Sequence, residues 1–211
     1  MHIEFLVEEL SAEEALRNIV PHMISNADTF DIHAHQGKTD LLEKLPGRLR
    51  GYKSWIPSDW RIVILLDVDD DICLTLKQKL ENIACTAGFI TKSSACSQMN
   101  FQVVNRIAIE ELEAWFFGDI TAVNAAYPRI STNIVHKAKY RNPDAILGGT
   151  WEALETILQK AGYFKGGMPK TTVAREISTH MLPMRNISHS FQVFYAGIIA
   201  LLGACPSNSK L

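Results

Sequence analysis

The chain has 211 residues, of which 47% are hydrophobic, and its formal net charge is −2 at pH 7. This length suits one well-buried domain plus an appendage and is short for two full domains. A charge this close to zero argues against a protein held on nucleic acid by bulk electrostatics, although a local basic patch is compatible with it. Neither a zinc finger nor a disulfide framework is indicated, because no CxxC pair or close Cys/His spacing occurs among Cys73, Cys85, Cys96 and Cys205.

The sequence shows no targeting or membrane-spanning pattern. It starts directly in a strand-like run, without the basic stretch and apolar core of a secretory signal. The longest apolar stretch, residues 193–205, is too short to cross a bilayer. We therefore expect a soluble cytoplasmic protein without a membrane partner.

The first 55 residues predict two strands and the helices that follow them. A strand over residues 3–7 precedes a helix, which Ser11 should N-cap because Glu14 three residues later completes a capping box. Pro21 should kink or end this helix, and residues 29–35 form a second strand. In the next helical pattern Pro46-Gly47 predicts an interruption, and therefore two short helices.

Two further strands follow, over residues 61–67 and 101–109, with a helix from Cys73 to Gly88 between them. The run 62–66 lacks polar alternation, which is typical of a parallel strand buried on both faces. Strands that alternate with helical segments predict an α/β fold with a parallel sheet flanked by helices.

After residue 120 the strand patterns cease. Helices are expected over residues 151–161, 171–181 and 190–203. We therefore divide the chain into an α/β core over residues 1–120 and a helical C-terminal portion over residues 121–211, packed on the core.

The third strand ends in an acidic run, from Asp67 through Asp69 to Asp71. Asp67 and Asp69 should point the same way, because side chains repeat every two residues in a strand. Carboxylates this close repel each other unless a cation lies between them. The alternative interpretation is that the acids only open the next helix, where the helix dipole favours them.

Acidic residues follow two other strands as well. Glu8 and Glu9 follow the first strand, and the run from Glu110 to Glu113 follows the fourth. The carboxyl ends of parallel strands meet at one edge of a sheet, which is where open α/β sheets bind ligands. Oxygen ligands select hard cations, so the predicted cofactor is Mg²⁺ or Mn²⁺. Such an ion can polarise a phosphodiester.

These motifs resemble a known family. A Glu after the first strand and a DxD after a later apolar strand form the pattern of Toprim domains, which cleave or transfer phosphodiesters in topoisomerases, primases and overcoming-lysogenisation-defect nucleases. The segments 5–9, 65–71, 109–116 and 188–191 look like an uncharacterised bacterial Toprim-related family, a domain of unknown function. That family is often encoded beside ATPases in presumed phage-defence loci.

The resemblance implies a Toprim-like core and assigns roles to the acids. Glu8 would be the general acid/base or a metal ligand, and Asp67 and Asp69 metal ligands, so that these three form the catalytic set. Many Toprim sequences have Gly where Glu9 stands, which leaves Glu8 and Glu9 both open as the key acid. The remaining metal-ligand candidates are Asp71, Glu111 and Glu113.

A few basic residues are candidates for contacts with nucleic acid. Lys170 lies near the position where the family resemblance places a basic residue. Basic and aromatic residues occur close together in one segment, where they could bind a phosphate backbone and a stacked base. This basic strip consists of Lys38, Arg48, Arg50 and Lys53, with Tyr52 and Trp55. A solvated helix face is the simpler interpretation of that strip. His33 and His35 share a strand face and are weaker candidates for a transition metal.

The leading functional hypothesis is a metal-dependent, Toprim-type nuclease or nicking enzyme, with nucleic acid and an ATPase as partners. The first alternative is a non-enzymatic regulatory or scaffold subunit of an ATPase system. The second is a small-molecule phosphohydrolase, since acids on an α/β edge also serve that chemistry. No GxxxxGK[ST] loop is present, so any ATP hydrolysis should come from a partner.

Overall fold

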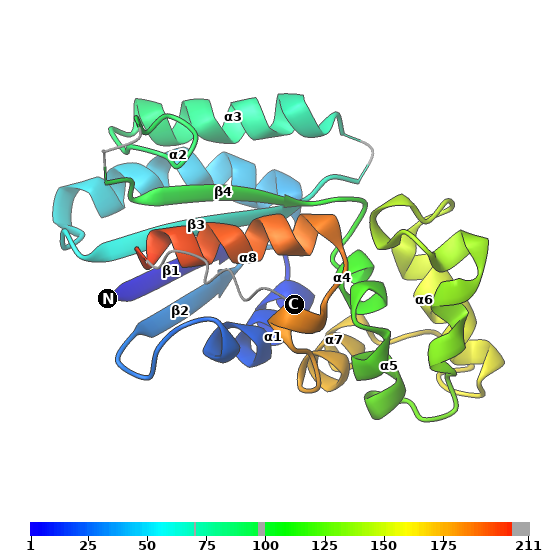
Figure 1. The fold of residues 1–211 in the computed structure, drawn as a ribbon. Coiled ribbons are helices and arrows are strands. Elements are labelled where there is room, and N and C mark those ends of the chain that lie inside the picture. Colours follow the sequence, from blue (N-terminus) through cyan, green and yellow to red (C-terminus); the bar gives the residue numbers. More distant parts are fainter. Residues whose placement is uncertain (70, 97–99, 204–211) are drawn as a thin grey trace.

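The computed structural model describes residues 1–69, 71–96 and 100–203. Its centre is a sheet of four parallel strands in the order β2-β1-β3-β4 (Figure 1). The strands are β1 His2–Val7, β2 Thr29–Ala34, β3 Trp60–Asp67 and β4 Val103–Ala108. This confirms the predicted α/β class and the parallel sheet, with strand ends within two residues of those expected.

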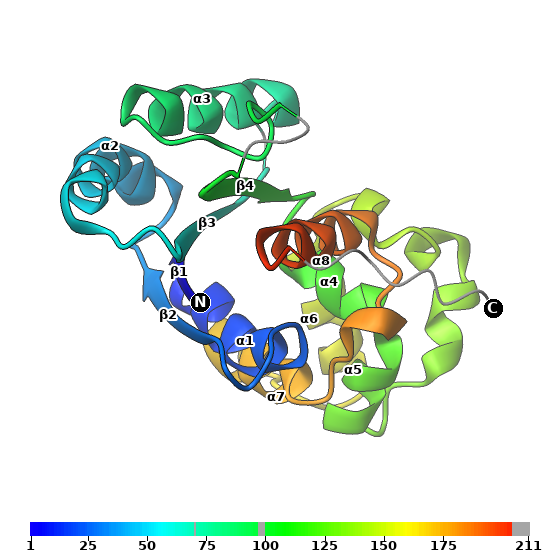
Figure 2. The ribbon, with the colours of Figure 1, turned by 60° about the vertical axis from the view of Figure 1, so that its left-hand side comes forward.

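Helices cover both faces of the sheet (Figure 2). Side chains such as Phe5 and Val63 pack on the face of α1 Leu10–Ile19 and α8 His189–Leu201. The alternate positions, such as Leu6 and Ile64, pack with α2 Lys38–Trp55 and α3 Cys73–Thr86. Burial on both faces explains why the strands read as unbroken apolar runs.

The other helices lie beyond the carboxyl ends of the strands (Figure 1). They are α4 Glu113–Gly118, α5 Ile120–Ala126, α6 Thr150–Lys160 and α7 Lys170–Ser178, joined by short 3₁₀ turns. The 3₁₀ turns are η1 Val20–His22, η2 Thr132–His136, η3 Ala138–Tyr140, η4 Pro143–Ala145 and η5 Pro183–Arg185. Past Ala108 no strand occurs in the described part of the chain, as predicted.

One apolar core joins the sheet to this helical portion. Trp115 of α4 lies against Phe191 and Phe194 of α8, and Phe194 lies 6.5 Å from Phe5 of β1 between ring centroids. Helix α7 packs along α1. None of the helices in the described ranges is both long enough and apolar enough to cross a bilayer.

Two local predictions were wrong. Pro46 lies inside the single helix α2 instead of dividing it. Leu41, Leu45 and Leu49 are buried at helical spacing on one face, and this packing outweighs the hydrogen bond that proline cannot donate. Ser11 is a residue of α1, and its hydroxyl donates to the carboxylate of the actual N-cap residue Glu9. The predicted end near Pro21 is confirmed, because α1 gives way to a 3₁₀ turn.

One carbonyl on the outer edge of β4 is paired by side chains. The carbonyl oxygen of Asn105 accepts hydrogen bonds from Lys77 Nζ at 3.0 Å and from Arg106 Nη1 at 2.7 Å. A carbonyl that a neighbouring strand could otherwise bind is therefore already paired.

Candidate functional site

Three carboxylates meet at the carboxyl edge of the sheet. Asp67 is the last residue of β3, and its backbone N–H donates to Glu8 Oε2, just after β1, at 3.2 Å. Glu113, which opens α4, is buried, and its charge acts on Asp67. The parallel sheet gathers these residues because its strands end side by side.

This grouping shifts the ionisation of Asp67 and Glu8. Burial raises the pKa of Asp67 well above its ordinary value, and the charges of Glu113, Glu8 and Asp69 raise it further. Burial also raises the pKa of Glu8, and Asp69 adds to this, whereas the hydrogen bond from the Asp67 amide opposes it. The charge of Lys38 also opposes the shift of Glu8, but burial and the neighbouring acids outweigh it.

The charges of Glu113 and Lys170 act on each other within this cluster. Burial raises the pKa of Glu113 to about 7; the charge of Lys170 opposes the shift, and those of Glu111 and Glu9 add to it. Burial would lower the pKa of Lys170, but Glu113, Glu9 and Glu111 raise it overall. Its ammonium lies 4.6 Å from the ring centroid of Trp151. The structure thus places Lys170 beside the acids.

Lys38 lies beside the cluster, at the start of α2. Its Nζ contacts Asp69 Oδ2 and Asp71 Oδ2, each at 2.8 Å, and donates to the Val68 carbonyl at 3.0 Å. Burial would lower the pKa of Lys38, but the two aspartates raise it overall, and the pKa of Asp71 falls in return. Asp69 and Asp71 are therefore neutralised in part by the chain itself. Asp70 lies outside the described residues.

The backbone is strained next to these acids. Asp69 has φ +46° and Glu110 has φ +64°, a left-handed region that residues with a side chain rarely adopt. The Asp69 N–H donates to the Glu110 carbonyl at 3.0 Å, so the two strained turns are tied together. Strain of this kind persists where surrounding structure enforces it, and functional sites are common among such places.

Glu111 has a structural partner. Its Oε2 accepts hydrogen bonds from the Trp151 amide at 2.7 Å and from Thr150 Oγ1 at 3.1 Å. It therefore caps the first turn of α6 from 40 residues away along the chain, so its proposed role as a metal ligand competes with this contact.

Most of the predicted basic strip leads away from the acids. About 22 Å of helix axis separates Lys38 from Lys53, at 1.5 Å per residue. Arg48 Nε donates to the Tyr52 hydroxyl at 3.2 Å, and Lys53 Nζ lies 4.9 Å from the Phe89 ring centroid. Arg50 is exposed. The structure thus brings Lys38, but not the other three, to the carboxyl edge.

A second polar cluster, which the sequence reasoning missed, lies on the α2 side of β1 and β2. His2 and Glu4 of β1 approach Asp31 of β2, and His33 contacts Glu4. Alternate positions in two neighbouring strands carry these residues, and that period of two was the available signal. His35 instead contacts the Val7 carbonyl, so the two histidines do not form a joint site.

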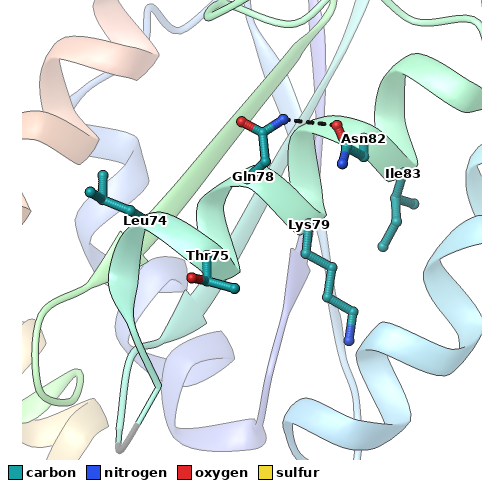
Figure 3. Close-up of a pocket in the computed structure, with 6 residues that line it drawn as sticks. All are labelled: Leu74, Thr75, Gln78, Lys79, Asn82 and Ile83. Atoms are coloured by element: carbon teal, nitrogen blue, oxygen red, sulfur yellow. Dashed lines mark hydrogen bonds between the residues drawn. The ribbon is translucent and has the colours of Figure 1, made fainter.

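A depression of about 560 Å³ runs along α3 (Figure 3). Gln78 and Asn82 are hydrogen-bonded on its wall, with Lys79 the one cation among its lining residues. Its lining residues include no carboxylate, and we assign no chemistry to it.

Over residues 7–199 the chain matches the model of a family described as a domain of unknown function, DUF4276. The chain belongs to this family. The matched region begins at the last residue of β1 and includes the other three strands, the acidic cluster and nearly all of α8. No curated protein and no solved structure matched the chain.

Proposed function

We propose that this DUF4276 protein is a metal-dependent, Toprim-type nuclease or nicking enzyme that acts on nucleic-acid phosphodiesters. One observation carries the proposal: Glu8, Asp67 and Glu113, from three separate segments, meet at the carboxyl edge with raised pKa values. Burial and mutual repulsion make the ionised form of these carboxylates unfavourable, and a bound cation would remove that cost. The grouping therefore indicates a cation site.

The residues fit a hard divalent cation. The donor set consists of carboxylate oxygens, which Mg²⁺ and Mn²⁺ prefer. Glu8, Asp67 and Asp69 would hold the ion. Lys38 would have to release Asp69 for this, and release Asp71 as well if that residue joined them. When bound, the ion would neutralise the cluster and polarise the phosphodiester.

The chain supplies the other functions that cleavage needs. Lys38 and Lys170 flank the acids and could bind phosphate oxygens. Glu113, with a pKa of about 7, can take or release a proton near neutral pH, and Glu8 is the second candidate for that role. Exposed Arg50 could extend the phosphate contacts along α2.

We further propose that an ATPase partner regulates this activity, in line with the Toprim-related family that the motifs resemble. A regulatory subunit without catalysis is the second candidate. It is favoured by three exposed apolar side chains between α7 and α8, which a partner would cover: Leu182, Met184 and Ile187, with exposed fractions of 45%, 74% and 61%.

The test is cleavage of supercoiled plasmid and of single-stranded DNA and RNA, with Mg²⁺, Mn²⁺ or EDTA, and with or without an ATPase of the kind encoded beside members of the family that the motifs resemble. Glu8→Gln and Asp69→Asn should each abolish cleavage. Asp59→Asn is the matched control, since this exposed aspartate lies at the amino end of β3 and should leave activity unchanged.

Binding variants separate capture of the substrate from chemistry. Neutralising Arg48, Arg50 and Lys53 together should weaken binding and flatten its salt dependence while cleavage at saturation persists. Activity that survives both acid substitutions would refute the assigned site. If no nucleic acid is cut under either condition, the regulatory role is the better account.

A further inference from the structure

The cluster of His2, Glu4 and Asp31 has the composition of a transition-metal site. His2 Nε2 lies 3.3 Å from Glu4 Oε1 and 3.7 Å from Asp31 Oδ2. One ligand atom from each of the three residues lies within 4.8 Å of the others. The cluster is separate from the acidic edge, because four residues of extended strand, about 13 Å, separate Glu4 from Glu8.

Glu4 is the centre of this cluster and is only 4% exposed. A buried carboxylate is costly unless positive charge compensates it. Among the described residues no lysine or arginine forms an ion pair with Glu4, and its neighbours are the imidazoles of His2 and His33. The polar partners of Glu4 are therefore two imidazoles and the Tyr52 hydroxyl, a set to which a bound cation would add the missing positive charge.

The ligand atoms are held in place by a second set of contacts. His2 Nδ1 is hydrogen-bonded to Thr29 Oγ1 at 2.8 Å, which directs Nε2 toward the two carboxylates. Glu4 Oε2 accepts from the Tyr52 hydroxyl at 2.9 Å and contacts His33 Nε2 at 2.5 Å, which leaves Oε1 on the side of His2. Partners that orient an imidazole and a carboxylate in this way are typical of metal sites.

The site is accessible from solvent. Asp31 has a side-chain exposure of 70%. A depression of about 430 Å³ adjoins Glu4 and is lined by His33, Arg48, Gly51, Tyr52 and Trp55. An ion could reach the three ligands past exposed Asp31 and keep a coordination position for water or a small ligand, as three-ligand sites do.

We propose that His2, Glu4 and Asp31 bind one Zn²⁺ ion, with Thr29, Tyr52 and His33 as the residues that position the ligands. One imidazole nitrogen with two carboxylate oxygens suits zinc better than Mg²⁺, which prefers oxygen ligands alone. This inference does not depend on the nuclease proposal, because it uses other residues and another metal.

The experiment uses the full chain, freed of any purification tag, and measures Zn²⁺ by competition with a chromophoric chelator. Wild type should bind one Zn²⁺ per chain. His2→Gln and Asp31→Asn should each weaken binding by about tenfold or more. Asp31 is exposed, so its variant should fold even if changes at Glu4 do not. His22→Gln, an exposed histidine outside the cluster, is the matched control and should bind as wild type does.

A spectroscopic arm locates the ion. Bound Co²⁺ should quench the fluorescence of Trp60, whose ring lies 4.0 Å from the ring of His2, and Trp60→Phe should lose that quenching. Failure of wild type to bind Zn²⁺ overturns the proposal, as does equal binding by wild type and both ligand variants. Loss of Zn²⁺ binding in Glu8→Gln would also overturn it, since the ion would then belong to the acidic edge.

Discussion

Asp67 illustrates how a residue proposed to bind a metal can lower stability while no metal is bound. Its carboxylate is buried beside Glu8 and Glu113, so its charge opposes folding when no cation is bound. Asp67→Asn keeps the size and removes the charge. The variant without metal should be as stable as wild type or more stable, by on the order of 1 kcal/mol, in urea unfolding.

The same variant should bind Mg²⁺ more weakly in calorimetry. If Asp67→Asn instead unfolds the protein, and wild type binds neither Mg²⁺ nor Mn²⁺, the acids serve the fold alone.

Glu113 should make stability depend on pH. Its pKa is about 7 in the folded protein against 4.5 ordinarily, so folding favours the protonated form. The associated stability is present below about pH 4.5 and is lost as pH rises to about 7. In EDTA, Glu113→Gln should therefore exceed wild type at pH 8, by up to about 3 kcal/mol, and match it near pH 4.5.

Urea unfolding across this pH range measures the difference. Glu43→Gln, on the exposed side of α2, should give a curve parallel to that of wild type. A Glu113→Gln variant with the same slope as wild type would show that the burial of Glu113 does not control its ionisation.

Residue by residue, the sequence could predict which acids approach the edge but not how each is used. Glu8 follows β1 and Asp67 ends β3, so the parallel topology alone brings them together. Glu111 is taken by the first turn of α6, a contact across 40 residues that no local pattern encodes. Lys170 reaches the acids only because α7 packs along α1. The role of each acid as a metal ligand stays a prediction.

Among the secondary elements, glycines inside helices offer a matched pair. A Cβ on Gly118 of α4 would lie 2.0 Å from Asn186 Oδ1 and 2.9 Å from Ser188 Cβ. Asn186 cannot move freely, since it donates to the Trp115 carbonyl at 2.8 Å and accepts from the Ser188 amide at 2.9 Å. Gly118→Ala should therefore destabilise the protein by about 1–3 kcal/mol.

Gly47 of α2 is the control, because a Cβ there meets nothing within 4 Å. Gly47→Ala should stabilise the protein by up to about 1 kcal/mol, since alanine favours the helix. Thermal and urea unfolding of both variants test the pair. A neutral Gly118→Ala would mean that the segment after η5 moves aside at no cost.

Helix α2 also shows where element prediction fails. The Pro46-Gly47 pair is a strong local signal for a break, yet the leucines of α2 bury a continuous face against the sheet. Strand prediction succeeded because burial on both faces leaves apolar runs that no polar residue interrupts. Local sequence signals fail to predict an element where tertiary packing stabilises it by more than the unfavourable residues cost.

For the whole molecule, the shared core predicts one cooperative unit. Phe5 in the sheet, Trp115 in α4 and Phe194 in α8 belong to one cluster of buried side chains. Calorimetry should show a single unfolding transition whose calorimetric and van't Hoff enthalpies agree. A chain ending at residue 120 should fail to fold, because it lacks α8 over β4. Two transitions, or a folded fragment, would support the division at residue 120 as a boundary between independent domains.

The paired carbonyl on the edge of β4 has a consequence for how the protein behaves in a crowded cell. An incoming strand from another molecule would have to displace both Lys77 and Arg106 from the Asn105 carbonyl before it could pair. The displaced charges of Lys77 and Arg106 would then be left without their hydrogen-bond acceptor, which is unfavourable for a buried charge. Pairing of a further strand is therefore opposed at this carbonyl, and growth of the sheet into open-ended polymers is discouraged there.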